Sequence, residues 1–181
     1  MATTEQPTGT TWRVDPVHSA VGFAATHMVV SIFRGRFERY DATLVDGDDG
    51  MQLAGSVDVA SLAVKDPDLA AHLRSAEFFD ADAHPELRFA STQIAVGADG
   101  GVVLDGQLTI KGRTRAVRAT GWGTPAVEDP FGGVRRGLAL EAVVDRRDYG
   151  LDWNLPLPSG GMALGDDVRL MVDLEFTRVE R

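Results

Sequence analysis

The chain alternates between apolar and polar residues with a period of two over most of its length, and this pattern constrains the fold more than any other feature. Near the C-terminus, Val168, Leu170 and Val172 fall on one face of an extended segment. Arg169 and Asp173 fall on the opposite face. Such alternation is typical of a half-buried antiparallel strand. Further strands are predicted near residues 19–28, 34–46, 52–59, 86–96, 102–111, 114–123 and 134–145.

One segment departs from this period and predicts a short helix near residues 66–76. Asp66 is a suitable N-cap, and Pro67 follows at the first helical position. Leu69 and Leu73 are four residues apart, so they fall on one face of that helix. A single helix in a strand-rich chain is expected to cover a sheet edge or the mouth of a barrel.

Turn residues separate the predicted strands and limit the architecture. Gly- and Asp-rich loops lie at residues 46–50, 97–101 and 129–133, and a tight turn lies at residues 111–112. Residues 154–161 are too rich in Pro and Gly to form a central strand. About eight strands at hairpin spacing predict an all-β fold, either a closed antiparallel barrel or a sandwich.

The length of 181 residues is sufficient for one domain of this kind. We expect residues 1–10 to be a flexible segment and residues 11–181 to form a single domain. The N-terminus has neither a basic region nor an apolar core of the kind found in secretory signals, so the sequence predicts a cytoplasmic protein. No apolar run approaches the roughly 20 residues that span a bilayer.

The formal net charge of −9 argues against nucleic acid as a partner, because a negative surface repels the phosphate backbone. The chain has no cysteine and therefore no disulfide or thiolate chemistry. An exposed edge strand offers a route to a homodimer.

Familiar catalytic motifs are missing, and we predict neither a cofactor nor a metal. No nucleophile elbow, zinc-ligand spacing or phosphate-binding loop is present. Of the four histidines, His27 shares a strand face with Val21 and Phe23 and is expected to point inward. It could satisfy a hydrogen bond in the core or contact the polar headgroup of a ligand. The residues alone leave both interpretations open.

Small residues recur within the predicted strands, among them Gly22, Ala25, Gly55, Ala119 and Ala142. A barrel of about eight strands is either filled by its own side chains or able to hold one small ligand. Small residues that point inward favour a cavity. The alternative is that they point outward or permit the strands to coil.

Six segments, in order along the chain, resemble the YceI family of polyisoprenoid-binding or lipid-binding proteins. They are residues 12–23 (WRVDPVHSAVGF), 26–28 (THM), 35–40 (GRFERY), 72–91 (HLRSAEFFDADAHPELRFAS), 106–114 (GQLTIKGRT) and 147–151 (RDYGL). The resemblance implies an extended, lipocalin-like antiparallel barrel with a long apolar tunnel. It also implies a ligand such as a polyisoprenoid, an isoprenoid quinone or a fatty-acid-like lipid.

Within such a barrel, the candidate ligand-binding residues fall into two groups. We predict that the apolar wall includes Phe23, Phe37, Phe79 and Trp153. A polar headgroup needs a few hydrogen-bond donors at the mouth. For this role we predict His27, Arg34 and His72, with Arg147 as a further candidate.

Three functions are compatible with these observations. The leading hypothesis is a carrier or sequestration protein for a long apolar or amphiphilic molecule. The second is an enzyme that acts on an apolar small molecule inside the barrel, with His27 or an aspartate as acid or base. The third is an interaction module that binds no ligand, which a filled barrel interior would favour.

Overall fold

The computed structural model describes residues 9–180, which form twelve strands, one α-helix and two 3-10 turns. The strands are β1 Gly9–Val14, β2 Ala20–His27, β3 Ser31–Phe37, β4 Tyr40–Gly47, β5 Gly50–Asp58, β6 Leu62–Ala63, β7 Glu86–Val96, β8 Gly101–Ile110, β9 Arg113–Gly123, β10 Val127–Glu128, β11 Val134–Asp145 and β12 Leu164–Arg178. The helix is α1 Pro67–Arg74, and the 3-10 turns are η1 Val59–Ser61 and η2 Arg146–Tyr149.

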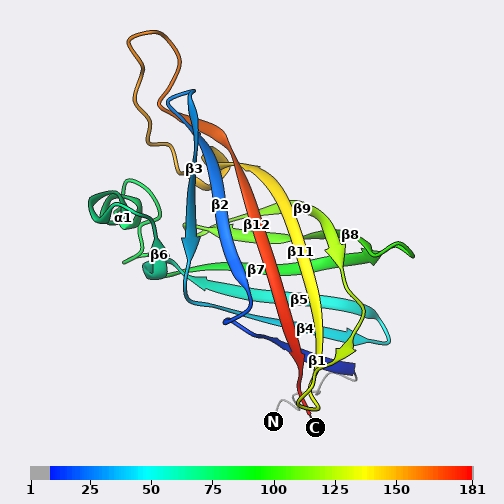
Figure 1. Ribbon diagram of the computed structural model, residues 1–181. Helices are drawn as coiled ribbons and strands as arrows, with labels where there is room; N and C mark the ends of the chain where they lie inside the picture. Colours follow the sequence, from blue (N-terminus) through cyan, green and yellow to red (C-terminus); the bar gives the residue numbers. More distant parts are fainter. Residues whose placement is uncertain (1–8, 181) are drawn as a thin grey trace, which may run out of the picture.

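Eight strands close into an antiparallel barrel in the order β11-β9-β8-β7-β5-β4-β1-β12, with β12 returning to β11 (Figure 1). This confirms the all-β prediction and selects the barrel over the sandwich. The hairpins predicted between β4 and β5, between β7 and β8 and between β8 and β9 are present. In the hairpin between β8 and β9, Lys111 and Gly112 have φ angles of +49° and +72°, which the tight turn requires.

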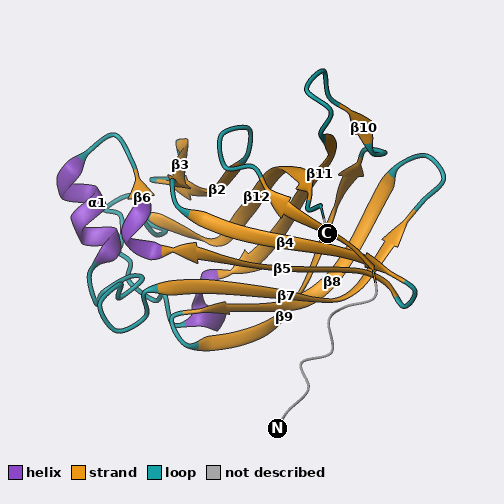
Figure 2. Ribbon diagram, turned by 90° about the horizontal axis from the view of Figure 1, so that it is seen from below, coloured by secondary structure: helices purple, strands orange, loops and turns teal. Residues whose placement is uncertain are grey.

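β12 is the longest strand and organises the barrel wall. One of its edges pairs with β11, from Asp167 to Thr177. Its other edge pairs first with β2 and then, from Phe176 to Arg178, with β1. The strands β2, β3 and β6 therefore extend from the barrel as a flap, and Figure 2 shows α1 on the same side as β3 and β6.

The helix forms as the sequence predicts, because its N-terminus is capped and its inner face is apolar. The Asp66 carboxylate accepts a hydrogen bond from the backbone N–H of Leu69 at 2.8 Å, and Pro67 occupies the first turn. Ala70 and Leu73 are the buried residues of the helix. No helix among the described residues is long and apolar enough to cross a bilayer.

Two hydrophobic clusters divide the interior. One, with Trp12, Leu44, Leu104 and Phe176 among its members, fills the barrel at the end where β1 lies. The other surrounds Phe23 and packs beneath α1. The predicted flexible segment of residues 1–10 lies outside the described residues except for Gly9 and Thr10, which begin β1.

Candidate functional site

A cavity of about 850 Å³ occupies the barrel between the two hydrophobic clusters and the flap. Its volume lies within the roughly 300–1,000 Å³ typical of small-molecule sites. Leu53, Leu104 and Leu140 belong to the cluster that fills the β1 end and also line the cavity, so they form its floor. The barrel is thus filled at one end and hollow toward the other.

Three of the four predicted wall residues form one aromatic group in this cavity. The ring centroids of Phe23 and Phe37 are 5.8 Å apart, and those of Phe37 and Phe79 are 5.9 Å apart. Phe23 and Phe79 are separated by 6.1 Å with an edge-on geometry. Contacts of this kind add stabilisation beyond simple burial. Phe79 follows α1 in the chain, so the segment after the helix contributes to the cavity wall.

Glycine at position 35 makes room for the Phe23 ring. Gly35 is the cross-strand partner of Phe23, and a Cβ atom there would lie 2.5 Å from Phe23 Cζ. Small residues predicted to favour a cavity also contribute to its lining, namely Gly22, Ala25, Gly55, Ala119 and Ala142. The hollow interior therefore follows from small side chains on the inner faces of several strands.

A second aromatic group lies near α1 and contains the remaining predicted wall residue. Trp153 is 5.0 Å from His72 and 5.3 Å from Phe78, measured between ring centroids. The His72 ring stands edge-on to both neighbours, and its Nε2 lies 2.7 Å from a Glu77 carboxylate oxygen. All three aromatic rings line the cavity. His72 thus belongs to the packed lining and also carries a polar contact.

The mouth of the cavity lies along the unpaired edge of β3. Among the described residues 9–180, β3 pairs with β6 only at Arg36 and Phe37, so residues 31–34 leave one backbone edge open there. All four of these residues line the cavity, and Lys65, Asp66 and Leu69 line it from the start of α1. The mouth therefore lies between a strand edge and the helix N-terminus.

Cationic and imidazole side chains gather at this mouth. His27 and Arg34 are exposed and both line the cavity. The expectation that His27 points into the core is therefore wrong, because it lies at the end of β2 where the strand turns into β3. Arg34 alternates with Gly35 along β3, so its side chain leaves the strand on the face opposite the Phe23 ring. Within residues 9–180, neither Arg34 nor Lys65 has a carboxylate partner. Both can therefore receive an anionic or hydrogen-bond-accepting group.

The fourth predicted headgroup residue, Arg147, lies outside the cavity lining, whereas its neighbour Arg146 belongs to it. Arg147 is exposed and bonds to Asp145 at 2.6 Å, and its guanidinium holds the pKa of Asp145 at about 2. Arg146 is buried and donates to the carbonyls of Leu151, Trp153 and Gly165. It thereby fixes the segment that carries Trp153 into the cavity.

The strand alternation contained the signal that distinguishes the two arginines. Ala142 and Val144 of β11 line the cavity, and Arg146 continues their face by two residues. Arg147 is one residue out of phase. The sequence prediction named Arg147, whereas the structure places Arg146 in the lining.

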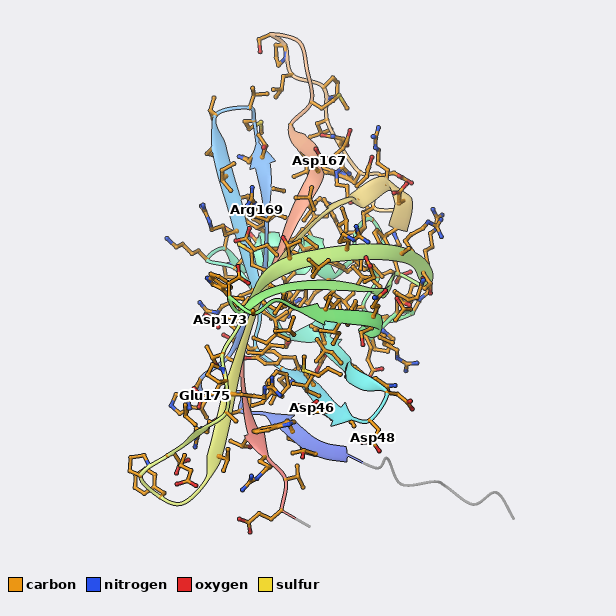
Figure 3. The ribbon with its side chains drawn as sticks, turned by 90° about the vertical axis from the view of Figure 1, so that its right-hand side faces the viewer. Asp46, Asp48, Asp167, Arg169, Asp173 and Glu175 are labelled. Carbon is orange, nitrogen blue, oxygen red and sulfur yellow. The ribbon has the colours of Figure 1, made fainter. Side chains whose placement is uncertain are left out.

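Acidic residues and a histidine form a separate cluster at the end of the barrel remote from the mouth. Figure 3 shows Asp167, Arg169, Asp173 and Glu175 spaced along β12 toward that end. One ligand atom from each of Asp15, His18 and Glu175 lies within 4.8 Å of the others, a spacing that suits a metal ion. The Arg135 guanidinium, however, donates to both carboxylates. Arg135 therefore already supplies, at these two carboxylates, the positive charge that a metal ion would bring.

Comparison with known proteins identifies relatives along nearly the whole chain. A family model described as a YceI-like domain matches residues 12–176. A UPF0312 protein of Staphylococcus epidermidis is 29% identical over 173 residues, covering 93% of this chain and 98% of the relative. A UPF0312 protein of Staphylococcus aureus is 28% identical over the same length and coverage.

Solved structures resemble the fold. The crystal structure of Burkholderia cenocepacia BcnA has a TM-score of 0.73 at 20% identity and covers 90% of this chain and 98% of its own. A polyisoprenoid binding domain from Saccharophagus degradans has a TM-score of 0.66 at 13% identity, covering 93% and 98%. At these identities the likeness concerns the fold alone.

Proposed function

The chain belongs to the YceI-like domain family, and on that premise we propose that its barrel binds one long apolar or amphiphilic molecule, as a carrier or sequestration protein. The candidate ligands are polyisoprenoids, isoprenoid quinones and fatty-acid-like lipids. The observation that carries the proposal is the cavity of about 850 Å³, whose buried lining side chains are hydrophobic apart from Arg146. A solved domain of the same fold is described as polyisoprenoid binding.

Burial of a hydrocarbon chain supplies enough free energy for this role. Each buried methylene contributes about 0.8 kcal/mol, so ten contribute roughly 8 kcal/mol before the cost of ordering the ligand. Burial also keeps Tyr149 neutral, because it raises the pKa of that phenol within the lining. The cavity interior therefore favours an uncharged chain over a charged group.

The rim supplies partners for a headgroup. Arg34 lies on β3, Lys65 precedes α1, and His27 ends β2 opposite Ser31; all three line the cavity. His72 lies beside Trp153. We assign the headgroup to this rim and the chain to the aromatic wall. Arg147 remains a prediction with no support from the cavity lining.

Native mass spectrometry of the purified protein, followed by organic extraction, tests the proposal. We expect a bound mass in the amphiphile range and an extract that contains a prenyl or acyl chain. A protein that is ligand-free and takes up neither prenyl nor acyl lipids would contradict it. An added lipid recovered as a different compound would instead favour the enzyme hypothesis.

Rim substitutions test the headgroup assignment. We expect His27→Ala and Arg34→Ala each to weaken the affinity for a lipid with an anionic headgroup by about tenfold or more, because a hydrogen bond to a charged group contributes about 1.5–3 kcal/mol. Arg36→Ala is the matched control, because Arg36 lies two residues further along β3, outside the lining, and pairs with Glu38. Unchanged affinity in both rim variants would refute the headgroup assignment and leave the cavity proposal standing.

A further inference from the structure

Two loops project beyond the barrel next to the cavity mouth and form an apolar tip. The first is the turn between β2 and β3, residues 28–30, and the second is the loop before β12, residues 154–163 (Figure 1). They are joined by a hydrogen bond from the Met28 N–H to the Ala163 carbonyl at 2.7 Å. We refer to these two loops together with Ile32 as the tip.

The tip and its flanks contain no charged residue. Residues 28–33 and 153–164 contain no Asp, Glu, Lys, Arg or His, although charged residues make up 25% of the sequence. The large hydrophobic side chains that the tip exposes are Met28, Val29, Val30, Ile32, Leu155 and Met162. An exposed apolar surface of this kind marks an interaction site.

Val29 and Val30 have no role in the cavity or in the two hydrophobic clusters. Val29 is 69% exposed and Val30 is 84% exposed, and neither lines the cavity. Val29 also adopts a φ of +64°, a left-handed conformation that is unfavourable for a β-branched residue. Asn or Gly would suit this turn better. Strained, exposed residues of this kind cluster at functional sites.

The tip is continuous with the cavity mouth. Met28, Ile32 and Leu155 are exposed on the tip and also line the cavity. The open edge of β3 begins at the same place. The apolar surface of the tip is therefore continuous with the cavity lining.

We propose that the tip docks on the surface of an uncharged or zwitterionic bilayer and places the cavity mouth among the lipids from which the ligand is taken. This inference rests on the proposed function. Projecting apolar side chains can enter the boundary between headgroups and acyl chains without exposing a charge to it. The cations of the rim, Arg34 and Lys65, then lie near lipid phosphates. The net charge of −9 disfavours an anionic surface.

A second copy of the chain fits the tip less well. Stable protein interfaces use about 20–30 residues on each side. The tip offers six exposed large hydrophobic side chains on two narrow projecting loops. Such a shape suits insertion into a soft interface better than packing against a rigid protein face.

The test uses flotation of the full chain with phosphatidylcholine vesicles. We expect the unmodified chain to float with the vesicles and Val30→Asp to reduce the bound fraction about tenfold, because a carboxylate must then approach the apolar interface. Val127→Asp is the matched control, since Val127 is 58% exposed on β10, outside both the cavity and the tip. It should float like the unmodified chain.

Val29→Asn separates docking from folding. Asn tolerates the left-handed conformation, so the melting temperature should stay the same or rise while vesicle binding falls. Vesicle binding that is absent in the unmodified chain, or unaffected by either tip substitution, would overturn the proposal.

Two further readouts keep this inference distinct from the proposed function. Lipid uptake from dilute solution without vesicles should be unchanged in Val30→Asp, because Val30 does not line the cavity. If the unmodified chain takes up lipid but does not bind vesicles, the docking inference alone is refuted. If it binds vesicles but takes up no lipid, the proposed function is refuted. A dimer in light scattering that Val30→Asp dissociates would assign the tip to a second copy instead.

Discussion

At the scale of single residues, the two adjacent arginines after β11 have different roles. Arg146 is 4% exposed and satisfies three backbone carbonyls, and it pairs with Asp166 at 2.8 Å. We expect Arg146→Met to lower the free energy of unfolding by about 3 kcal/mol, because buried carbonyls lose their donors. It should also weaken lipid binding, since the segment that carries Trp153 is released. Chemical denaturation and a lipid titration measure the two effects.

Arg147→Met is the control for this residue-scale prediction. It removes the same charge one position away, where the side chain is exposed and bonds to Asp145. Its cost should stay below about 1 kcal/mol, as for other surface ion pairs. Equal losses of stability in the two variants would contradict the role given to Arg146.

The cavity residues differ in how far the sequence alone could identify them. Phe23 and Phe37 were predicted because they lie on predicted strands within segments that resemble the family. Phe79 lies outside the strands, in the turn after α1, and was predicted from the family resemblance. Arg146 was missed because a buried arginine contradicts the usual expectation for charged residues. Its burial is favourable because the carbonyls of Leu151, Trp153 and Gly165 surround the guanidinium, and the sequence pattern does not show how the loop after η2 folds back to place them there.

At the scale of elements, α1 is a cover whose stability depends on its cap. The Asp66 carboxylate accepts a hydrogen bond from the Leu69 N–H at the start of the helix, beside the cavity mouth. We expect Asp66→Ala to cost about 1 kcal/mol of helix stability. Amide hydrogen exchange over residues 67–74 should accelerate about fivefold, the factor that corresponds to this energy.

Asp68→Ala provides the comparison, because Asp68 is acidic and lies in the same turn but is not the capping residue. Exchange in that variant should change by less than twofold, since only a weak charge–dipole interaction is lost. If both variants exchange at the same rate, the cap is not what holds α1 in place.

The helix and the hairpins could be predicted from local sequence, whereas the open edge of β3 could not. Caps, turns and alternation depend on residues close together in the chain. The open edge depends on β3 pairing with β6, which is only Leu62–Ala63, and on β12 changing partners from β2 to β1. Such pairings join residues far apart in sequence, so the mouth became visible only in the folded chain.

At the scale of the whole molecule, the hollow and filled ends of the barrel are stabilised differently. The mouth end depends on aromatic packing and on Arg146. The other end depends on a charged cluster in which Arg135 bonds to Asp15, Asp129 and Glu175. His18 and Arg135 hold the pKa of Asp15 at about 2. Since β1, β11 and β12 meet there, this cluster ties together the strands that close the barrel.

This arrangement predicts how stability depends on pH. The pKa of Asp15 is lower in the folded chain than the value of 3.8 expected when it is unfolded, so its carboxylate stabilises the fold above about pH 4. That contribution is lost as the pH falls from about 4 toward 2, because protonation removes the bonds to His18 and Arg135. Thermal melts across this range should show a steep decline in the melting temperature.

Asp15→Asn separates the Asp15 contribution from general acid unfolding. The variant should be less stable at pH 7 by about 1–2 kcal/mol, and its stability should decline less steeply below pH 4. Asp48→Asn is the control, because Asp48 lies in the exposed β4–β5 turn (Figure 3). Its pH profile should match that of the unmodified chain. If Asp15→Asn retains the full acid-dependent decline, other carboxylates dominate, and the Arg135 cluster is not the element that closes this end of the barrel.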